Sequence, residues 1–161
     1  MPKTSVLVPA INEKARVMTA GHLQSVLFLL IDLALQSKQA HWNVVGPNFR
    51  PLHLHLDELW DTVQKWSDAV AERMLALDVP ARGQVTDIRD ESTLDALPPG
   101  RLADTKVISL VADRIETVAA RTREAMEAVE ELDLVTQDLF MEVIHDLEKH
   151  LWMFRSQIQA G

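Results

Sequence analysis

Four long stretches of the chain repeat apolar residues at steps of three and four, which is the spacing of one face of an α-helix. They cover residues 16–44, 48–77, 104–131 and 133–158. In the first stretch the repeated positions are Leu23, Val26, Leu27, Leu30, Leu33 and Ala34. The pattern therefore predicts four long helices.

The breaks between these stretches carry residues that end or begin helices. Asn43, Gly46 and Pro47 follow the first stretch, and Asp133 is suited to cap the fourth. Pro51 falls in the first turn of the second stretch, where a proline is tolerated because the amide that it lacks would have no partner.

The connection between the second and third helices, residues 79–103, is long and rich in proline and glycine. Within it, residues 92–97 predict one short, capped helix. Four helices with one crossover connection favour an all-α fold, a ferritin-like four-helix bundle with a short extra helix in that connection. We expect an N-terminal arm (1–15), the bundle (16–158) and a C-terminal end (159–161).

Composition limits the possible functions of the protein more than it limits the possible folds. The 161 residues fit one domain, and 24 acidic against 16 basic residues give a formal charge of -8. Such a charge repels phosphate backbones and favours metal cations or neutral partners. The absence of cysteine excludes disulfides, thiolate metal sites and cysteine nucleophiles. Without an export signal or an apolar run of membrane-spanning length, we expect a cytoplasmic protein with no membrane partner.

Five side chains of metal-ligand type lie on the first two predicted helices. His41 stands near the end of the first, and His53, Asp57, Asp68 and Glu72 lie on the second. At about 100° per residue, these last four fall within about 100° of one another and share one helix face. Mixed imidazole and carboxylate ligands suit iron(II), manganese and zinc. From the angle alone, a solvated charged face is an equally good interpretation.

The axial spacing of these residues favours a site shared between chains. Asp57 and Asp68 are 11 residues apart, or roughly 16 Å along the helix axis. In one chain, the pair His53 and Asp57 therefore cannot bind the same ion as Asp68 and Glu72. Two chains packed antiparallel about a twofold axis would bring the two pairs together and generate two such sites.

At these residues the chain resembles the Dps family, the miniferritins or DNA-binding proteins from starved cells. The motif reads Lys38-Gln-Ala-His-Trp-Asn-Val-Val-Gly46, then Phe49, Leu52-His53, Leu56-Asp57-Glu58 and Asp68-Ala-Val-Ala-Glu-Arg73. The helix pattern, the long second connection and the ending Asp146-Leu-Glu-Lys…Leu151-Trp152 extend the resemblance over most of the chain.

The resemblance implies a hollow cage of twelve subunits with di-iron ferroxidase sites at its twofold interfaces. Iron(II) would be oxidised there, preferably by hydrogen peroxide rather than dioxygen, and stored as a ferric mineral, which protects against oxidative stress. His41, His53 and Asp57 would come from one subunit and Asp68 and Glu72 from its neighbour. All five residues are present.

The resemblance also suggests roles for Trp42 and for a stripe of acidic residues. The family has a tryptophan beside the ligand His41 that quenches reactive oxidant; packing at a helix end is the alternative role for Trp42. Acidic residues near the start of the family's fourth helix line a threefold pore that admits iron. Here Asp138, Glu142 and Asp146 form such a stripe, for which a solvated face is the alternative.

The remaining candidate ligands carry weaker signals. Glu142 and His145 have the Glu-x-x-His spacing of di-iron bundles, but the second helix offers no matching motif, so we interpret them as an exposed pair. His22, His55 and His150 have no carboxylate partner in the motif. We expect them to be surface histidines or histidines with satisfied hydrogen bonds.

DNA compaction by a nucleoid-associated structural protein is the alternative function. Residues 1–16 contain three basic side chains, Lys3, Lys14 and Arg16, and one acidic side chain, Glu13. Their net side-chain charge is three minus one, or +2. So few charges on an acidic chain predict weak DNA binding, although many copies could still act by avidity. The charge balance favours the ferroxidase.

Overall fold

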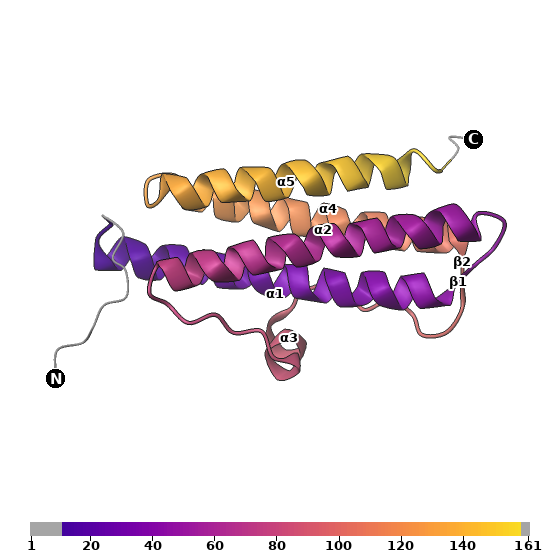
Figure 1. Ribbon diagram of the computed structural model, residues 1–161, viewed down its shortest axis with the longest axis horizontal. Helices are drawn as coiled ribbons and strands as arrows, with labels where there is room; N and C mark the ends of the chain where they lie inside the picture. Colours follow the sequence, from indigo (N-terminus) through magenta and orange to yellow (C-terminus); the bar gives the residue numbers. More distant parts are fainter. Residues whose placement is uncertain (1–10, 159–161) are drawn as a thin grey trace.

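Four long helices lie side by side along the longest axis of the molecule (Figure 1). They are α1 (Glu13–Asn43), α2 (Phe49–Ala76), α4 (Asp104–Ala128) and α5 (Leu134–Arg155). The computed structural model describes residues 11–158, so most of the expected arm and the three C-terminal residues lie outside the described residues. The all-α, ferritin-like bundle is as predicted, and no end of these helices differs from its expected position by more than three residues.

Helix α1 begins at Glu13, three residues earlier than expected, because Asn12 caps it: the side-chain oxygen of Asn12 accepts a hydrogen bond from the amide of Ala15 (2.9 Å). Its apolar residues pack against α2 and α4 in the centre of the bundle. By length and composition α1 could cross a membrane, but 56% of its most apolar window is buried in the bundle, as is typical of a core helix.

The core consists of large apolar side chains that all four helices contribute. The largest fully buried ones are Leu23, Leu30, Leu33, Leu52, Leu56, Leu59, Met74, Leu77, Ile108, Ile115, Phe140 and Phe154. Burial of each stabilises the fold by about 1.5–3 kcal/mol before the loss of conformational entropy. The core therefore fixes which face of each helix remains for chemistry.

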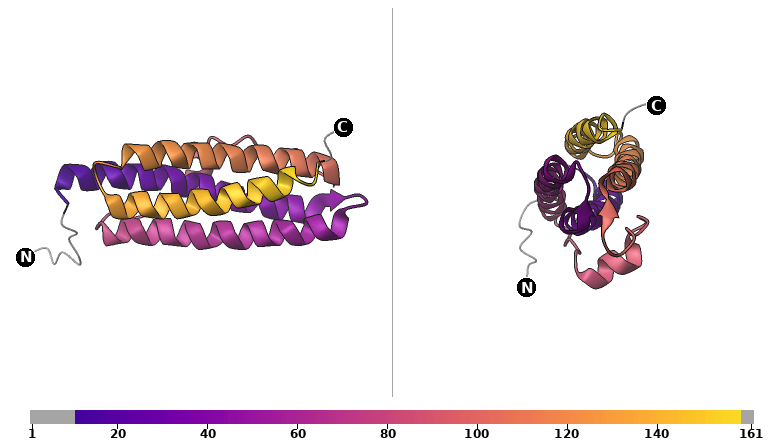
Figure 2. Two further views of the ribbon diagram at one scale, coloured as in Figure 1. Left: turned by 90° about the horizontal axis from the view of Figure 1, so that it is seen from above. Right: turned by 90° about the vertical axis from the view of Figure 1, so that its right-hand side faces the viewer.

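The connection from α2 to α4 runs along the outside of the bundle and contains α3 (Val85–Glu91), which lies against α1 (Figure 2). At its end, β2 (Leu102–Ala103) pairs in parallel with β1 (Val44–Val45), with Val44 opposite Leu102. This two-residue ladder ties the end of α1 to the start of α4. The helical periodicity gives no sign of it.

The short extra helix of the connection exists, but the prediction that it spans residues 92–97 is wrong. The Asp87 carboxylate accepts a hydrogen bond from the amide of Gln84 (3.1 Å) and starts α3 there. Ser92 ends the helix, since its amide donates to the carbonyl of Ile88 (3.0 Å).

Distant partners hold residues 92–97 in a non-helical conformation. The Ser92 hydroxyl donates to the Asp32 carboxylate on α1, and the carbonyl of Ala96 accepts from the Arg114 guanidinium on α4 (3.2 Å). Arg114 is buried and also donates to Gln36 of α1 (3.1 Å). These bonds use polar groups that a local helix would need.

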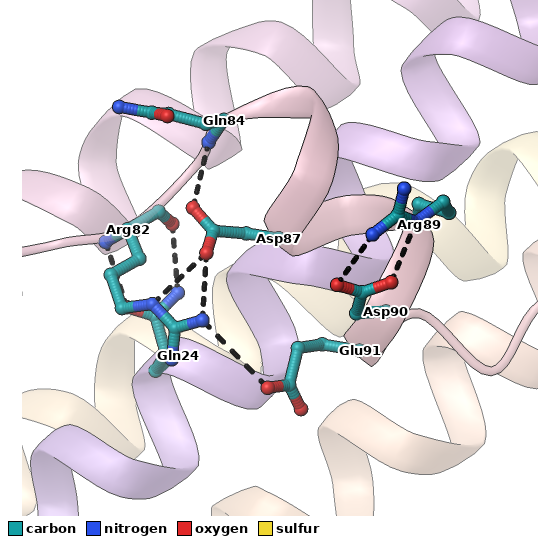
Figure 3. A network of polar contacts seen from close by, with 7 residues as sticks. All are labelled: Gln24, Arg82, Gln84, Asp87, Arg89, Asp90 and Glu91. Atoms are coloured by element: carbon teal, nitrogen blue, oxygen red, sulfur yellow. Dashed lines mark hydrogen bonds and ion pairs between the residues drawn. The ribbon is translucent and has the colours of Figure 1, made fainter.

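A polar network fastens the first part of the same connection to α1 (Figure 3). The side-chain amide of Gln24 donates to the carbonyl of Arg82 (2.9 Å) and accepts from its amide (2.8 Å). The Arg82 guanidinium donates to Asp87 (2.7 Å) and lies 3.7 Å from Glu91. The connection is thereby held at both of its ends.

Candidate metal centre

The turn between α1 and α2 brings two of the predicted ligands into contact. The geometry of the turn depends on Gly46, whose φ of +138° is one that glycine adopts readily and other residues rarely do. It also depends on the buried Asp104, whose carboxylate accepts a hydrogen bond from the amide of Asn48 (2.8 Å). As a result the His41 and His53 rings stack, with their centroids 3.6 Å apart and their planes at 20°.

The two imidazoles are held by reciprocal hydrogen bonds to the backbone. Nδ1 of His41 lies 2.9 Å from the carbonyl oxygen of His53, and Nδ1 of His53 lies 2.9 Å from the carbonyl oxygen of His41. A carbonyl only accepts, so each Nδ1 carries the proton and donates it. In the neutral rings, Nε2 is then left with a lone pair suited to bind a metal, and the bond from Nδ1 to the backbone fixes the tautomer.

Asp57 adds a carboxylate to this pair. Its Oδ1 lies 3.3 Å from Nδ1 of His41 and accepts a hydrogen bond from the Lys38 ammonium, which also lies over the Trp60 ring at 4.6 Å. The hydrogen bond from Lys38 is the largest cause of a lowered pKa of Asp57. The carboxylate is therefore ionised at neutral pH, and three of the five predicted ligands lie together.

The other two predicted ligands, Asp68 and Glu72, are not near this group. Both are exposed on α2, and within residues 11–158 neither makes an ion pair or a side-chain hydrogen bond. In the same described part of one chain, no cluster of three or more histidine, aspartate or glutamate side chains is arranged to hold a metal ion. Completion of the site by a second subunit stays a prediction.

Lys38 is the member of this group that the spacing of the ligands does not indicate. It appeared only as the first residue of the family motif, whereas the structure places its ammonium on the Asp57 carboxylate. Its position three residues before His41, and so on a neighbouring part of the α1 surface, is the signal that could have found it.

Trp42 is 71% exposed, although it follows directly after the buried His41. Packing within the subunit is therefore not its role. Phe49 is also exposed and lies 5.0 Å from the His53 ring, centroid to centroid. Aromatic surface thus lies beside the three clustered ligands.

The three candidate pore residues differ in their surroundings. Asp138 and Glu142 are exposed. Asp146 is half-buried and accepts a hydrogen bond from the indole of Trp66 (2.9 Å), and the Lys65 ammonium lies 3.9 Å away. A role in binding passing cations is therefore easier for Asp138 and Glu142.

The remaining histidines lie in different surroundings. His145 and Glu142 are both exposed. His22 is half-buried. His150 is buried with both ring nitrogens hydrogen-bonded, and one of its partners is His55. Within residues 11–158, none of them is hydrogen-bonded to or stacked on the clustered ligands.

Comparison with known proteins shows the family of the chain. The family model of the ferritin-like domain matches residues 20–161. The chain is 36% identical over 160 residues to the DNA protection during starvation protein of Mycolicibacterium smegmatis. These residues are 98% of this chain and 86% of that relative. The chain belongs to the Dps family of ferritin-like proteins.

Other Dps proteins are similar over most of the chain. The DNA protection during starvation protein 2 of Deinococcus radiodurans is 38% identical over 137 residues, which are 85% of this chain but only 57% of that relative. The structure of Mycobacterium smegmatis Dps has a TM-score of 0.93 at 33% identity, covering 98% of this chain and 90% of that one. Dps from Microbacterium arborescens in its high iron form has a TM-score of 0.88 at 27% identity, covering 93% and 97%.

Proposed function

We propose that this Dps protein is a ferroxidase and iron-storage protein, with iron(II) as its substrate and a ferric mineral as its cargo. The observation that carries the proposal is the close approach of His41, His53 and Asp57, in which hydrogen-bonded Nδ1 atoms leave each neutral imidazole a lone pair on Nε2 and the carboxylate is ionised. The solved structure of a related Dps in a high iron form supports iron as that cation.

Hydrogen peroxide is the preferred oxidant in this proposal. Two iron(II) ions each give one electron to one peroxide, whose O–O bond breaks to give two water molecules after uptake of two protons. Two ions held together deliver both electrons to the same peroxide, so no hydroxyl radical is released. Hydrolysis of the iron(III) formed then deposits mineral and releases protons.

The site is shared between twofold-related subunits of a twelve-subunit cage. Within one chain Asp57 and Asp68 lie 11 positions apart on α2, or roughly 16 Å along its axis. An antiparallel neighbour would supply Asp68 and Glu72 to the cluster of the first subunit, which explains why these two carboxylates are exposed and unpaired within residues 11–158. The exposed Trp42 beside His41 would be covered by the same neighbour and placed to quench oxidant.

Iron would reach the cavity through a threefold pore lined by residues of α5. Asp138 and Glu142 are the better candidates for this role, since Asp146 is already bonded to Trp66. Negative charge concentrated in a narrow channel raises the local concentration of cations.

The proposal is tested by measuring iron(II) oxidation after addition of hydrogen peroxide to metal-free protein. Asp68→Ala and Glu72→Ala each remove an anionic ligand from an exposed helix position, where alanine keeps the helix. We expect both to abolish rapid oxidation, whereas Asp113→Ala, an exposed acid on α4, leaves the rate unchanged. Wild-type rates in both Asp68→Ala and Glu72→Ala would contradict the assignment.

Compaction of DNA is the second candidate, because several relatives carry the name DNA protection during starvation protein. The net negative charge of the chain and the small positive charge of its N-terminal region predict weak DNA binding. A gel shift at physiological salt, beside the oxidation assay, separates the two functions. We propose a cytoplasmic location for either function, and association with the nucleoid for the second.

A further inference from the structure

A chain of hydrogen bonds joins α2 to α5 on the side of α2 that faces away from the clustered ligands. His150 of α5 is buried, and its Nδ1 lies 3.3 Å from Nε2 of His55 on α2. Nε2 of His150 lies 3.0 Å from the hydroxyl of Thr62, also on α2. At the other end, the Gln157 side-chain amide lies 3.2 Å from Nδ1 of His55.

The two ends of this chain determine the direction of every bond in it. The Thr62 hydroxyl has one hydrogen and donates it to the carbonyl of Glu58 (2.9 Å), so its oxygen accepts from Nε2 of His150. Nδ1 of His150 then carries no hydrogen and accepts a hydrogen bond from Nε2 of His55. Nδ1 of His55 in turn accepts from Gln157, whose other amide hydrogen goes to the carbonyl of Met153 (3.2 Å).

Both imidazoles are therefore neutral and each is confined to one tautomer. Burial is the main reason that the pKa of His150 is lowered to about 4, and the neighbouring His55 lowers it further. The His55 ring is also stacked on the buried Phe154, with centroids 4.2 Å apart. Rotation of α2 about its own axis at this level would break these contacts.

The orientation of α2 at this level matters for the clustered ligands. His53 lies two residues before His55 and about 200° around the helix. The His41 ring belongs to α1 and is bonded to the backbone carbonyl of His53 on α2, so a rotation of α2 displaces His53 relative to His41. A rotation of about 10° moves a ligand atom about 6 Å from the axis by about 1 Å, and a functional site tolerates about 0.5 Å.

We propose that His150 is a positioning residue for the ferroxidase site. Through His55 it fixes the rotation of α2, and this rotation sets the separation of the Nε2 atoms of His41 and His53. The inference rests on the proposed function, since it concerns the geometry of the same cation site. His150 itself contacts none of the five proposed ligands among the described hydrogen bonds.

Cobalt(II) is a suitable probe, because it is not oxidised by the reaction and its visible absorption reports ligand geometry. His150→Leu removes both bonding nitrogens. His150→Gln keeps an acceptor for His55 and a donor for Thr62, in the same order as the histidine. His145→Leu is the control on the same helix, where the side chain is 77% exposed.

We expect His150→Leu to weaken cobalt binding by about tenfold, the lower end of the effect of removing a group that orients a metal ligand, and to change the visible bands. His150→Gln should restore both the affinity and the bands, which a role in stability alone would not require. His145→Leu should resemble the wild type. If His150→Leu does not fold, Thr62→Val removes one bond at constant volume and should change the bands in the same direction.

The inference is overturned if folded His150→Leu binds cobalt with unchanged affinity and bands, or if His150→Gln fails to restore them. Failure of the proposed function has a different signature. In that case His53→Ala would leave the cobalt spectrum of the wild type unchanged, whatever the His150 variants do.

Discussion

Replacement of Gly46 by alanine tests how the turn between α1 and α2 is built. A Cβ atom at this position would lie 2.6 Å from Cγ of Asp104 and 2.7 and 2.8 Å from its two carboxylate oxygens. Asp104 cannot yield freely, since its oxygens accept from the amides of Asn48 and Thr105 (2.8 Å each). The φ of +138° adds backbone strain for any residue with a side chain.

The two effects give the expected size of the change in stability. Strain at such a φ costs about 1–3 kcal/mol, and overpacking costs about 1–3 kcal/mol. Gly46→Ala should therefore lower the free energy of unfolding by about 4 kcal/mol, the middle of the summed range. For a chain of this length that is a fall in Tm of roughly 10 °C.

Two other glycines separate strain from collision. Gly100 has a φ of +86° but open space around its Cβ position, so Gly100→Ala should lower the stability by the strain alone, about 1–3 kcal/mol. Gly21 lies within α1 with nothing near its Cβ position, and Gly21→Ala should stabilise by about 0.5–1 kcal/mol. Thermal unfolding followed by circular dichroism, at one fixed subunit concentration, ranks the three variants. A Gly46→Ala protein as stable as Gly100→Ala would refute the collision with Asp104.

Two further predictions concern pH and salt. Burial raises the pKa of Asp133, but hydrogen bonds from Thr136 and the Arg73 guanidinium (2.5 Å) outweigh it and leave this pKa lowered. The contribution of the Asp133 carboxylate to stability is then present above the usual aspartate pKa and is lost as the pH falls through the lowered pKa. Asp133→Asn should therefore flatten the decline of Tm in acid. An unchanged decline of Tm would contradict this. DNA binding, measured by gel shift, should weaken steeply as salt rises and should disappear when residues 1–15 are deleted. Tight retention by the truncated protein at about 0.15 M salt would show a cationic surface elsewhere.

Helical periodicity was sufficient to predict the bundle because each long helix buries a continuous apolar face. The positions Leu23, Leu30 and Leu33, chosen from spacing alone, are all fully buried. The connection was harder, since Ser92 and Ala96 take partners from α1 and α4 that lie far away in the sequence. A local helix signal cannot include such bonds.

In the candidate site too, local spacing predicts some features, whereas others depend on residues that are distant in the sequence. The spacing on α2 correctly separates the His53 and Asp57 pair from Asp68 and Glu72, because helical rise depends only on residue number. The stacking of His41 on His53 depends instead on the turn that Gly46 and Asp104 hold. The asymmetry between Asp146 and the other pore candidates arises from Trp66, on another helix.

A mixed-subunit experiment tests the central claim, that the two halves of the site come from different chains. One variant combines His41→Ala with His53→Ala, and the other combines Asp68→Ala with Glu72→Ala. Each variant alone should be inactive in peroxide-driven iron(II) oxidation. Cages reassembled from equal amounts should regain about one quarter of the wild-type sites, the share expected when each half is drawn at random. Mixed cages of confirmed composition that remain inactive, like either variant alone, would contradict a site shared between subunits.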